Sequence, residues 1–131
     1  MTHIHVVAAI IHHPDRERIL LARRPDHLHQ GGLWEFPGGK VEAGEPPHLA
    51  LQRELAEELA IQVLRAEPFL AVRHQYPDKS VLLDIWQVRE FAGTPVGNEG
   101  QAILWARRAE LPGYRFPAAN QPIVEALLRD S

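Results

Sequence analysis

The sequence predicts an α/β sandwich, and three observations support that fold class. Short apolar runs typical of buried strands lie on both sides of one long amphipathic segment. A second amphipathic segment closes the chain. The 131 residues are 45% apolar, which suits one domain with a substantial core. Strands on both sides of a long helix, with another helix at the end, favour a sheet covered by helices over a helical bundle.

The individual elements are predicted from apolar periodicity and from turn residues. Pro46 and Pro47 suit the first turn of the long helix, where proline is tolerated best. Asn120 is a candidate N-cap for the last helix. The expected strands are residues 6–11, 19–22, 69–76, 81–90 and 102–106, the expected loops are 23–44 and 93–100, and the expected helices are about 46–60 and 122–129.

Composition excludes several classes of protein. The formal net charge of −3 provides no basic surface for gripping a nucleic-acid polymer. The absence of cysteine excludes disulfides and thiolate chemistry, and it fits a reducing cytoplasm. No stretch approaches the roughly 20 apolar residues of a membrane span, and the N-terminus lacks the basic leader of a signal peptide. We therefore expect a soluble cytoplasmic protein.

The stretch RELAEELA, residues 53–60, crowds glutamates onto one helix face. At about 100° per residue, Glu54, Glu57 and Glu58 fall within an arc of roughly 100°. Like charges at these spacings each cost about 0.2–0.5 kcal/mol, and by spacing Arg53 can neutralise only Glu57. A solvated helix surface would explain a charge run by itself. However, these carboxylates lie outside the first turn that the helix dipole favours. Their convergent oxygens, beside the glycine-rich loop PGGKVEAGE, are the ligands that magnesium prefers.

The stretch GKVEAGEPPHLALQRELAEELAI, residues 39–61, resembles the signature of the Nudix hydrolases. Its first glycine is followed by five residues and a glutamate, then by seven residues and the run REL, with two glutamates one residue further on. The resemblance implies the Nudix fold, a mixed sheet between helices, and cleavage of nucleoside diphosphates linked to another group. Ala60 departs from the pattern, which has glycine there. A left-handed alanine would cost about 1–2 kcal/mol, so we expect a slightly different exit from the helix.

Further stretches between residues 20 and 122 are similar to the MutT subgroup of this family, namely LLARRPD, WEFPGGK, GNEGQ and FPAANQP. The resemblance implies hydrolysis of oxidised purine nucleoside triphosphates, such as 8-oxo-dGTP, to the monophosphate and pyrophosphate. Water would attack the β-phosphorus. The implied partner is a small nucleoside triphosphate, with no nucleic-acid polymer and no membrane, and we expect a monomer.

The resemblance also implies a role for individual residues. Either Glu54 or Glu99 would act as the general base. Arg53 would orient a neighbouring carboxylate, and Glu45 would fix the loop to the helix. The implied ligands of Mg²⁺, for which Mn²⁺ could substitute, are the carbonyl of Gly38 and the carboxylates of Glu54, Glu57, Glu58 and Glu99. The implied nucleotide-binding residues are Arg24, His29, Glu35, Phe36, Pro37, Gly38 and Asn120.

Several of these residues have a second interpretation. Asn120 could simply cap the last helix. In the MutT-like context its amide offers one donor and one acceptor, which match the oxidised guanine edge, where N7 carries a proton beside the O6 acceptor. Against normal guanine one hydrogen bond is lost, at about 1–3 kcal/mol, or roughly 10- to 100-fold in preference. Arg24 could be an ordinary surface arginine, and Phe36 could belong to the core.

Two other functions stay open. A Nudix hydrolase for another nucleotide, such as CTP or ADP-ribose, would use the same carboxylates. A nucleotide-sensing module could keep the fold and bind without hydrolysis. The complete set of carboxylates argues against the sensor, because a binding protein has no need of all four.

Overall fold

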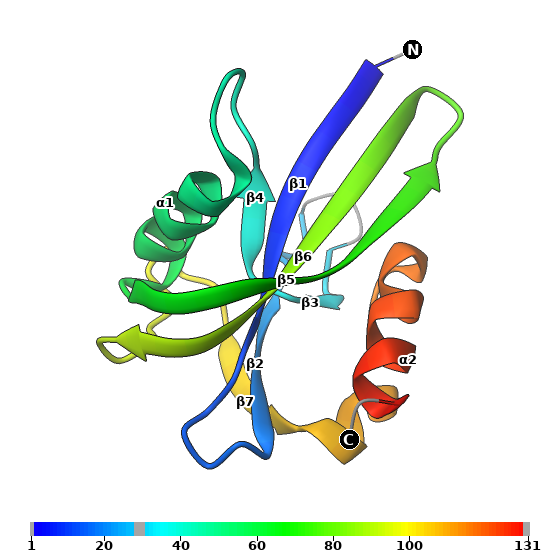
Figure 1. Ribbon diagram of the computed structural model, residues 1–131. Helices are drawn as coiled ribbons and strands as arrows, with labels where there is room; N and C mark the ends of the chain where they lie inside the picture. Colours follow the sequence, from blue (N-terminus) through cyan, green and yellow to red (C-terminus); the bar gives the residue numbers. More distant parts are fainter. Residues whose placement is uncertain (1, 28–30, 130–131) are drawn as a thin grey trace.

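A computed structural model of the chain describes residues 2–27 and 31–129. In this part of the chain, strands lie between helix α1 on one side and helix α2 on the other (Figure 1). The predicted α/β/α sandwich is therefore confirmed. The elements are β1 (Thr2–Ile11), β2 (Arg18–Arg23), β3 (Trp34–Glu35), β4 (Gly38–Lys40), α1 (Pro47–Leu59), β5 (Gln62–Gln75), β6 (Lys79–Ala92), β7 (Ile103–Arg107), the 3₁₀ helices η1 (Arg108–Gly113) and η2 (Ala118–Asn120), and α2 (Gln121–Arg129).

The strands form two sheets. The larger sheet has the order β4-β1-β6-β5, and the smaller one has the order β3-β2-β7. Strand β1 runs parallel to β6 along its whole length and antiparallel to β4. The remaining pairs, β5 with β6 and β2 with both of its neighbours, are antiparallel. The larger sheet is therefore mixed, as the resemblance implied, and β1 lies in its interior.

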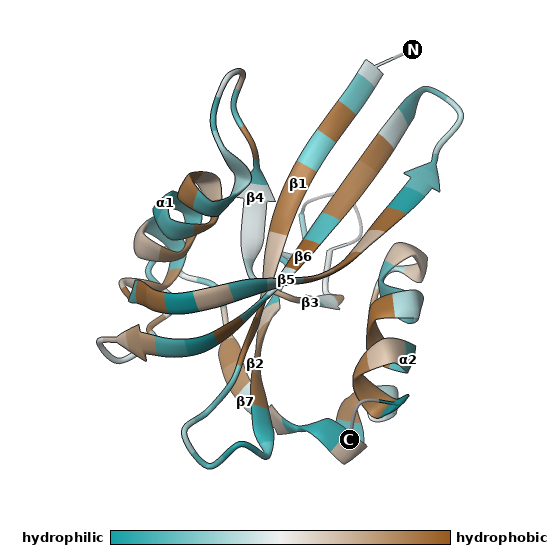
Figure 2. Ribbon diagram, viewed as in Figure 1, coloured by the Kyte–Doolittle hydropathy of each residue, from teal (hydrophilic) through white to brown (hydrophobic). Residues whose placement is uncertain are grey.

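The core explains the uninterrupted apolar run at residues 6–11. Val7, Ala9 and Ile11 are buried in one cluster with three leucines of α1, Leu51, Leu55 and Leu59. Ala8 and Ile10 are buried in another cluster with α2. A strand with both faces covered reads as a continuous apolar run, because successive side chains point to opposite faces. Figure 2 shows the result, with hydrophobic residues along β1 and β2 and hydrophilic residues in the turn that joins them.

Several element boundaries differ from the prediction. Strand β5 begins at Gln62 rather than at residue 69, because its first half is largely exposed and carries too many polar side chains to show an apolar pattern. The predicted loop 23–44 contains β3 and β4, two very short strands formed by backbone pairing. Helix α2 begins at Gln121, directly after η2. Among the described residues, no helix is long and apolar enough to cross a membrane.

Helix α1 has the predicted bounds, but the conformation of its exit differs from the prediction. Proline occupies its first turn, and no side chain caps it there. At the other end Ala60 itself takes the left-handed conformation, with φ 58° and ψ 36°. The expectation of a different exit is therefore wrong. The Ala60 N–H donates to the Ala56 carbonyl at 3.1 Å, and Val96 N–H donates to the Leu59 carbonyl at 3.1 Å. These contacts hold the turn, so the chain accepts a strained alanine where glycine would be relaxed.

Candidate active site

Two glycines of β4 allow close contacts, Gly38 with strand β1 and Gly39 with helix α1. In β4, Gly38 lies opposite Ala8 of β1, and Gly39 lies opposite Val7. A Cβ on Gly38 would collide with the Val7 carbonyl, and one on Gly39 would collide with the Glu54 carboxylate. The Glu54 side chain, only 15% exposed, therefore rests against the β4 backbone. Gly39, in the predicted glycine-rich loop, thus leaves the space that the Glu54 carboxylate occupies.

Arg53 joins the loop before α1 to the helix. Its Nε and Nη2 donate to the two carboxylate oxygens of Glu45, both at 2.9 Å. Its Nη1 donates to Glu54 at 2.9 Å. The guanidinium, followed by the N–H of Glu42, lowers the pKa of Glu45 to about 2. Geometry therefore supports the predicted role of Glu45 as an anchor between loop and helix.

The prediction that Arg53 would reach only Glu57 is wrong. Glu57 is one of the more distant partners, with 3.8 Å between Nη1 and Oε2. The guanidinium turns toward the loop instead of lying along the helix. Its Nη2 also donates to the carbonyl of Lys40, in β4, at 3.1 Å. The Glu57 side chain is left 57% exposed. Helical spacing alone missed this because it considers only partners on the helix.

The segment 93–100 closes the C-terminal end of α1. The last carbonyls of an α-helix have no partners within the helix, and here donors from this segment and from Gln101 bind them. Because Glu99 lies between two of the donor residues, the capping contacts carry it to the acidic end of α1. The hydrogen bonds are Val96 N to Leu59 O at 3.1 Å, Asn98 N to Glu58 O at 3.0 Å, Asn98 Nδ2 to Glu57 O at 2.9 Å and Gln101 Nε2 to Glu58 O at 3.0 Å.

The carboxylates at this end of α1 repel one another. Burial, followed by the charges of Glu54, Glu99 and Glu35, raises the pKa of Glu58 to about 8, against a hydrogen bond from the Gly38 N–H. Burial also raises the pKa of Glu54, against the contacts with Arg53. A positive ligand placed among these groups would relieve the repulsion.

A cavity of about 380 Å³ opens beside this cluster, between β1, β2, β4 and the end of α1. Its lining includes six of the twelve residues that the sequence assigned to the site. Three further polar residues, Arg23, Lys40 and Gln101, also line it and were not assigned to the site. Gln101 stands in the quoted stretch GNEGQ, and Lys40 follows the two glycines, so both were within reach of the sequence. The predicted residues in the lining are Arg24, Glu35, Phe36, Gly38, Glu58 and Glu99.

Other predicted residues lie outside this lining. The Glu54 carboxylate lies against Gly39, which itself lines the cavity, and the Glu57 side chain is mostly exposed. Pro37 is buried, and its carbonyl accepts a hydrogen bond from Ala9 N–H at 2.8 Å, so it belongs to the pairing of β1. His29 lies outside the described residues.

Asn120 lines a second cavity, of about 210 Å³, with Arg24 and Glu35. The first cavity includes the same Arg24 and Glu35, whose side chains pair at 3.1 Å between Nη1 and Oε2. In the described part of the chain, the Asn120 side chain makes no hydrogen bond to the first turn of α2. Asn120 is instead the last residue of η2, and its N–H donates to the Pro117 carbonyl at 2.9 Å. The N-cap interpretation is therefore wrong, because the 3₁₀ turn runs straight into the helix.

Phe36 is a core residue, as one of its two interpretations predicted. It is 4% exposed and stacks on Phe116, with ring centroids 5.2 Å apart. It also lines the larger cavity. Phe36 is thus a core residue that forms part of the cavity wall.

The donor set suits a divalent cation, although the carboxylates are not gathered at one point. Within residues 2–27 and 31–129, no three His, Cys, Asp or Glu side chains lie close enough together to hold a metal ion. The groups that raise the pKa of Glu58 are nevertheless hard oxygen donors from three segments of the chain.

Comparison with known proteins adds independent support. The family model described as NUDIX domain matches residues 6–126. The chain belongs to the Nudix family. A CTP pyrophosphohydrolase of Escherichia coli is 41% identical over 98% of this chain and 93% of its own length. The 8-oxo-dGTP diphosphatase of the same organism is 36% identical over 98% and 99%. A solved MutT structure, from work on Aliivibrio salmonicida and Vibrio cholerae, covers 99% of this chain and 100% of its own, with 43% identity and a TM-score of 0.87.

Proposed function

We propose that this Nudix protein is a single-domain, monomeric, cytoplasmic enzyme that hydrolyses 8-oxo-dGTP to 8-oxo-dGMP and pyrophosphate with Mg²⁺. One observation carries the proposal. The carboxylate-lined cavity and the cavity that contains Asn120 share Arg24 and Glu35 as a common wall. A nucleotide could therefore place its phosphates in the first cavity and its base in the second. The similarity to 8-oxo-dGTP diphosphatases supports the same assignment.

In the proposed reaction, a water oxygen bonds to the β-phosphorus, and the bridging bond to the monophosphate breaks. Glu54, Glu57, Glu58 and Glu99, with the Gly38 carbonyl, would hold the divalent metal. Such ions polarise phosphoryl oxygens and lower the pKa of bound water. The proton of the attacking water goes to a carboxylate, and Lys40 and Arg24 in the cavity lining provide positive charge toward the phosphates.

Two carboxylates compete for the role of general base. The pKa of Glu54 is raised toward neutral pH, which favours base catalysis. However, Arg53 already donates a hydrogen bond to one oxygen of Glu54. Glu99 is exposed beside the cavity and is held through its N–H, which donates to Gln101 at 2.9 Å. Comparing the pH dependence of kcat in Glu54→Gln and Glu99→Gln tests the choice, because only loss of the base removes the acidic limb of the profile.

A substrate panel tests the proposed activity. We expect monophosphate and pyrophosphate from 8-oxo-dGTP at a kcat/KM well above that for dGTP. The Asn120→Ala variant should lose efficiency toward 8-oxo-dGTP by roughly 10- to 100-fold, because one matched pair of hydrogen bonds disappears, and it should lose far less toward dGTP. An equal loss for both substrates would exclude Asn120 as the discriminating residue. Equal rates for both substrates in the wild type would contradict the substrate assignment.

CTP hydrolysis is the second candidate function. It is favoured by the 41% identity to a CTP pyrophosphohydrolase. Pyrimidines lack the imidazole edge, so Asn120 would not read CTP through the N7 position. Including CTP in the same panel separates the two candidates. A CTP enzyme should hydrolyse CTP more efficiently than 8-oxo-dGTP, both as wild type and as Asn120→Ala. Its activity toward CTP should change little in the Asn120→Ala variant.

A further inference from the structure

A second polar cavity lies at the opposite end of β1 from the N-terminus. Strands β1 and β6 run parallel, and this cavity of about 430 Å³ lies at the C-terminal end of β1, beside the last residues of β6. Its lining shares no residue with either cavity of the candidate active site. Its volume falls within the range of small-molecule sites, roughly 300–1,000 Å³.

The lining is strongly basic, although the protein carries a formal net charge of −3. Four arginines and two histidines line the cavity, and Glu90 is the only carboxylate among the lining residues that the structure describes. Glu90 lies 3.9 Å from Arg65, at the limit of an ion pair. Positive charge therefore exceeds negative charge inside the cavity. The four arginines are Arg16, Arg65, Arg89 and Arg108.

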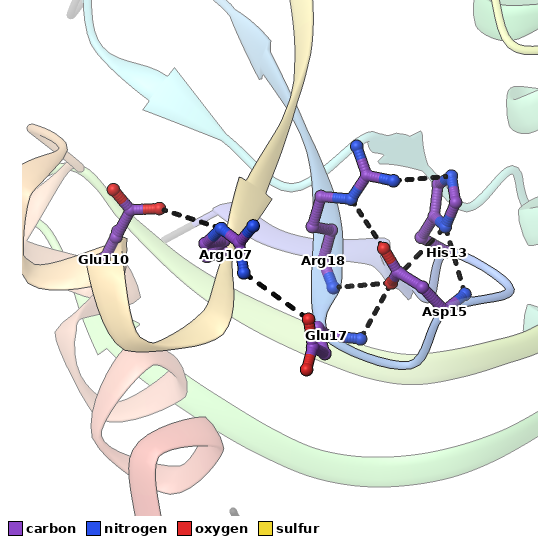
Figure 3. Close-up of polar contacts among 6 residues, drawn as sticks. All are labelled: His13, Asp15, Glu17, Arg18, Arg107 and Glu110. Atoms are coloured by element: carbon purple, nitrogen blue, oxygen red, sulfur yellow. Dashed lines mark hydrogen bonds and ion pairs between the residues drawn. The ribbon is translucent and has the colours of Figure 1, made fainter.

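Of the carboxylates near the cavity, Glu67 pairs with the cavity's own Arg89, with 2.8 Å between Oε1 and Nε, whereas others are engaged by arginines outside the lining. Figure 3 shows two such groups. Asp15 accepts from Arg18 Nε at 2.7 Å. Glu17 and Glu110 both face Arg107, at 3.4 Å and 4.0 Å. In the part of the chain that the structure describes, no ion pair is left for Arg16 or Arg108.

Two features of the lining indicate ligand binding rather than a purely structural role. The Nε of Arg108 is buried and has no hydrogen-bond partner among the described residues, and such a group is unfavourable unless something accepts its proton. Register shifts occur on both sides of Arg65 in the pairing of β5 with β6. Bulges of this kind re-aim a side chain and are frequent beside binding sites.

We propose that this cavity binds a small anion carrying at least two phosphoryl groups. A guanidinium presents its N–H donors as a planar fork that matches phosphate oxygens two at a time. Arginines from the β1–β2 turn, β5, β6 and η1 surround one concave space, so separate guanidiniums can engage separate phosphoryl groups. Divalent metal is not needed, because the described lining contains a single carboxylate, that of Glu90, against four arginines.

Calorimetric titration with inorganic pyrophosphate, in EDTA and at constant ionic strength, tests the proposal. We expect one binding event, with inorganic phosphate binding about tenfold more weakly or worse, because fewer charged hydrogen bonds form. The double variant Arg65→Gln/Arg108→Gln should lower pyrophosphate affinity by about tenfold or more. Arg73→Gln is the matched control, since Arg73 is an exposed arginine on the same strand as Arg65 and lies outside the cavity.

Arg16→Gly keeps the test decisive if the double variant does not fold. Arg16 has a φ of 65°, which glycine adopts without strain, so this variant should fold at least as well as the wild type. It should still bind pyrophosphate more weakly. The proposal is overturned if the wild type releases no binding heat in EDTA. It is also overturned if the folded pocket variants bind as well as Arg73→Gln.

Discussion

The two faces of the junction between α1 and β4 treat their carboxylates in opposite ways. On the outer face Arg53 and Glu45 form a two-pronged ion pair, and the pKa of Glu45 falls to about 2. On the inner face Glu58 lies among other carboxylates, and its pKa rises to about 8. Charges on the outer face are compensated within the protein and stabilise the fold. Among the described residues Glu58 has no ion pair with an arginine or lysine, so its charge is compensated only by a proton or a ligand, which is the arrangement expected of a functional site.

Removing a charge from the inner face should give the largest effect. We expect Glu57→Gln and Glu58→Gln to lower kcat by orders of magnitude while the protein stays folded, because each change deletes a proposed metal ligand and preserves side-chain volume. Glu125→Gln, on the exposed face of α2, is the control for loss of one negative charge. Near-normal turnover of both variants at saturating Mg²⁺ would contradict the metal-site assignment.

The pH dependence of stability should distinguish the two faces in metal-free protein. Glu58 binds its proton more tightly in the folded state, so stability is highest below the ordinary pKa of 4.5 and falls as pH rises toward about 8. The unfolding midpoint in EDTA should therefore decrease across this window. Glu58→Gln should flatten the decrease, and Mg²⁺ should raise the midpoint most at the alkaline end. A midpoint indifferent to Mg²⁺ at pH 8 would favour a merely solvated helix face.

Breaking the outer face should have the opposite pH signature. Because the folded pKa of Glu45 is depressed, its contribution is present above pH 4.5 and is lost as pH falls through about 2. Arg53→Gln should therefore lower the unfolding midpoint at pH 7, and the difference from wild type should shrink on acidification. Turnover should fall by about 10- to 100-fold, as for a residue that positions a metal ligand. Arg107→Gln, which loses only exposed pairs with Glu17 and Glu110, should change neither quantity much.

The sequence predicted the inner face better than the outer one for a physical reason. Glu54, Glu57 and Glu58 follow from helical spacing, which depends only on local geometry. The partners of Arg53 and the position of Glu99 depend on the path of loops, which apolar periodicity does not describe. Strands as short as β3 and β4 carry no period at all.

The wall that the two cavities share shows the same limit of prediction from sequence. Arg24 and Glu35 meet because β2 and β3 pair with Ala22 opposite Glu35, a register that only the folded chain defines. The resemblance to a known family supplied these residues, whereas composition and spacing could not.

The smallest effect should come from the end of α1, which supports both faces. Ala60→Gly relieves a left-handed alanine, worth about 1–2 kcal/mol, and adds about 0.5–1 kcal/mol of backbone entropy cost. The net stabilisation of about 0.5–1 kcal/mol corresponds to a rise of roughly 2–5 °C in the unfolding midpoint. Turnover and the pH profile should stay unchanged, because the hydrogen bonds from Val96 and Asn98 already hold the helix end in place. A large change in turnover would mean that the position of Glu99 depends on strain at Ala60, and the contrast between the two faces would then reflect helix geometry as well as charge.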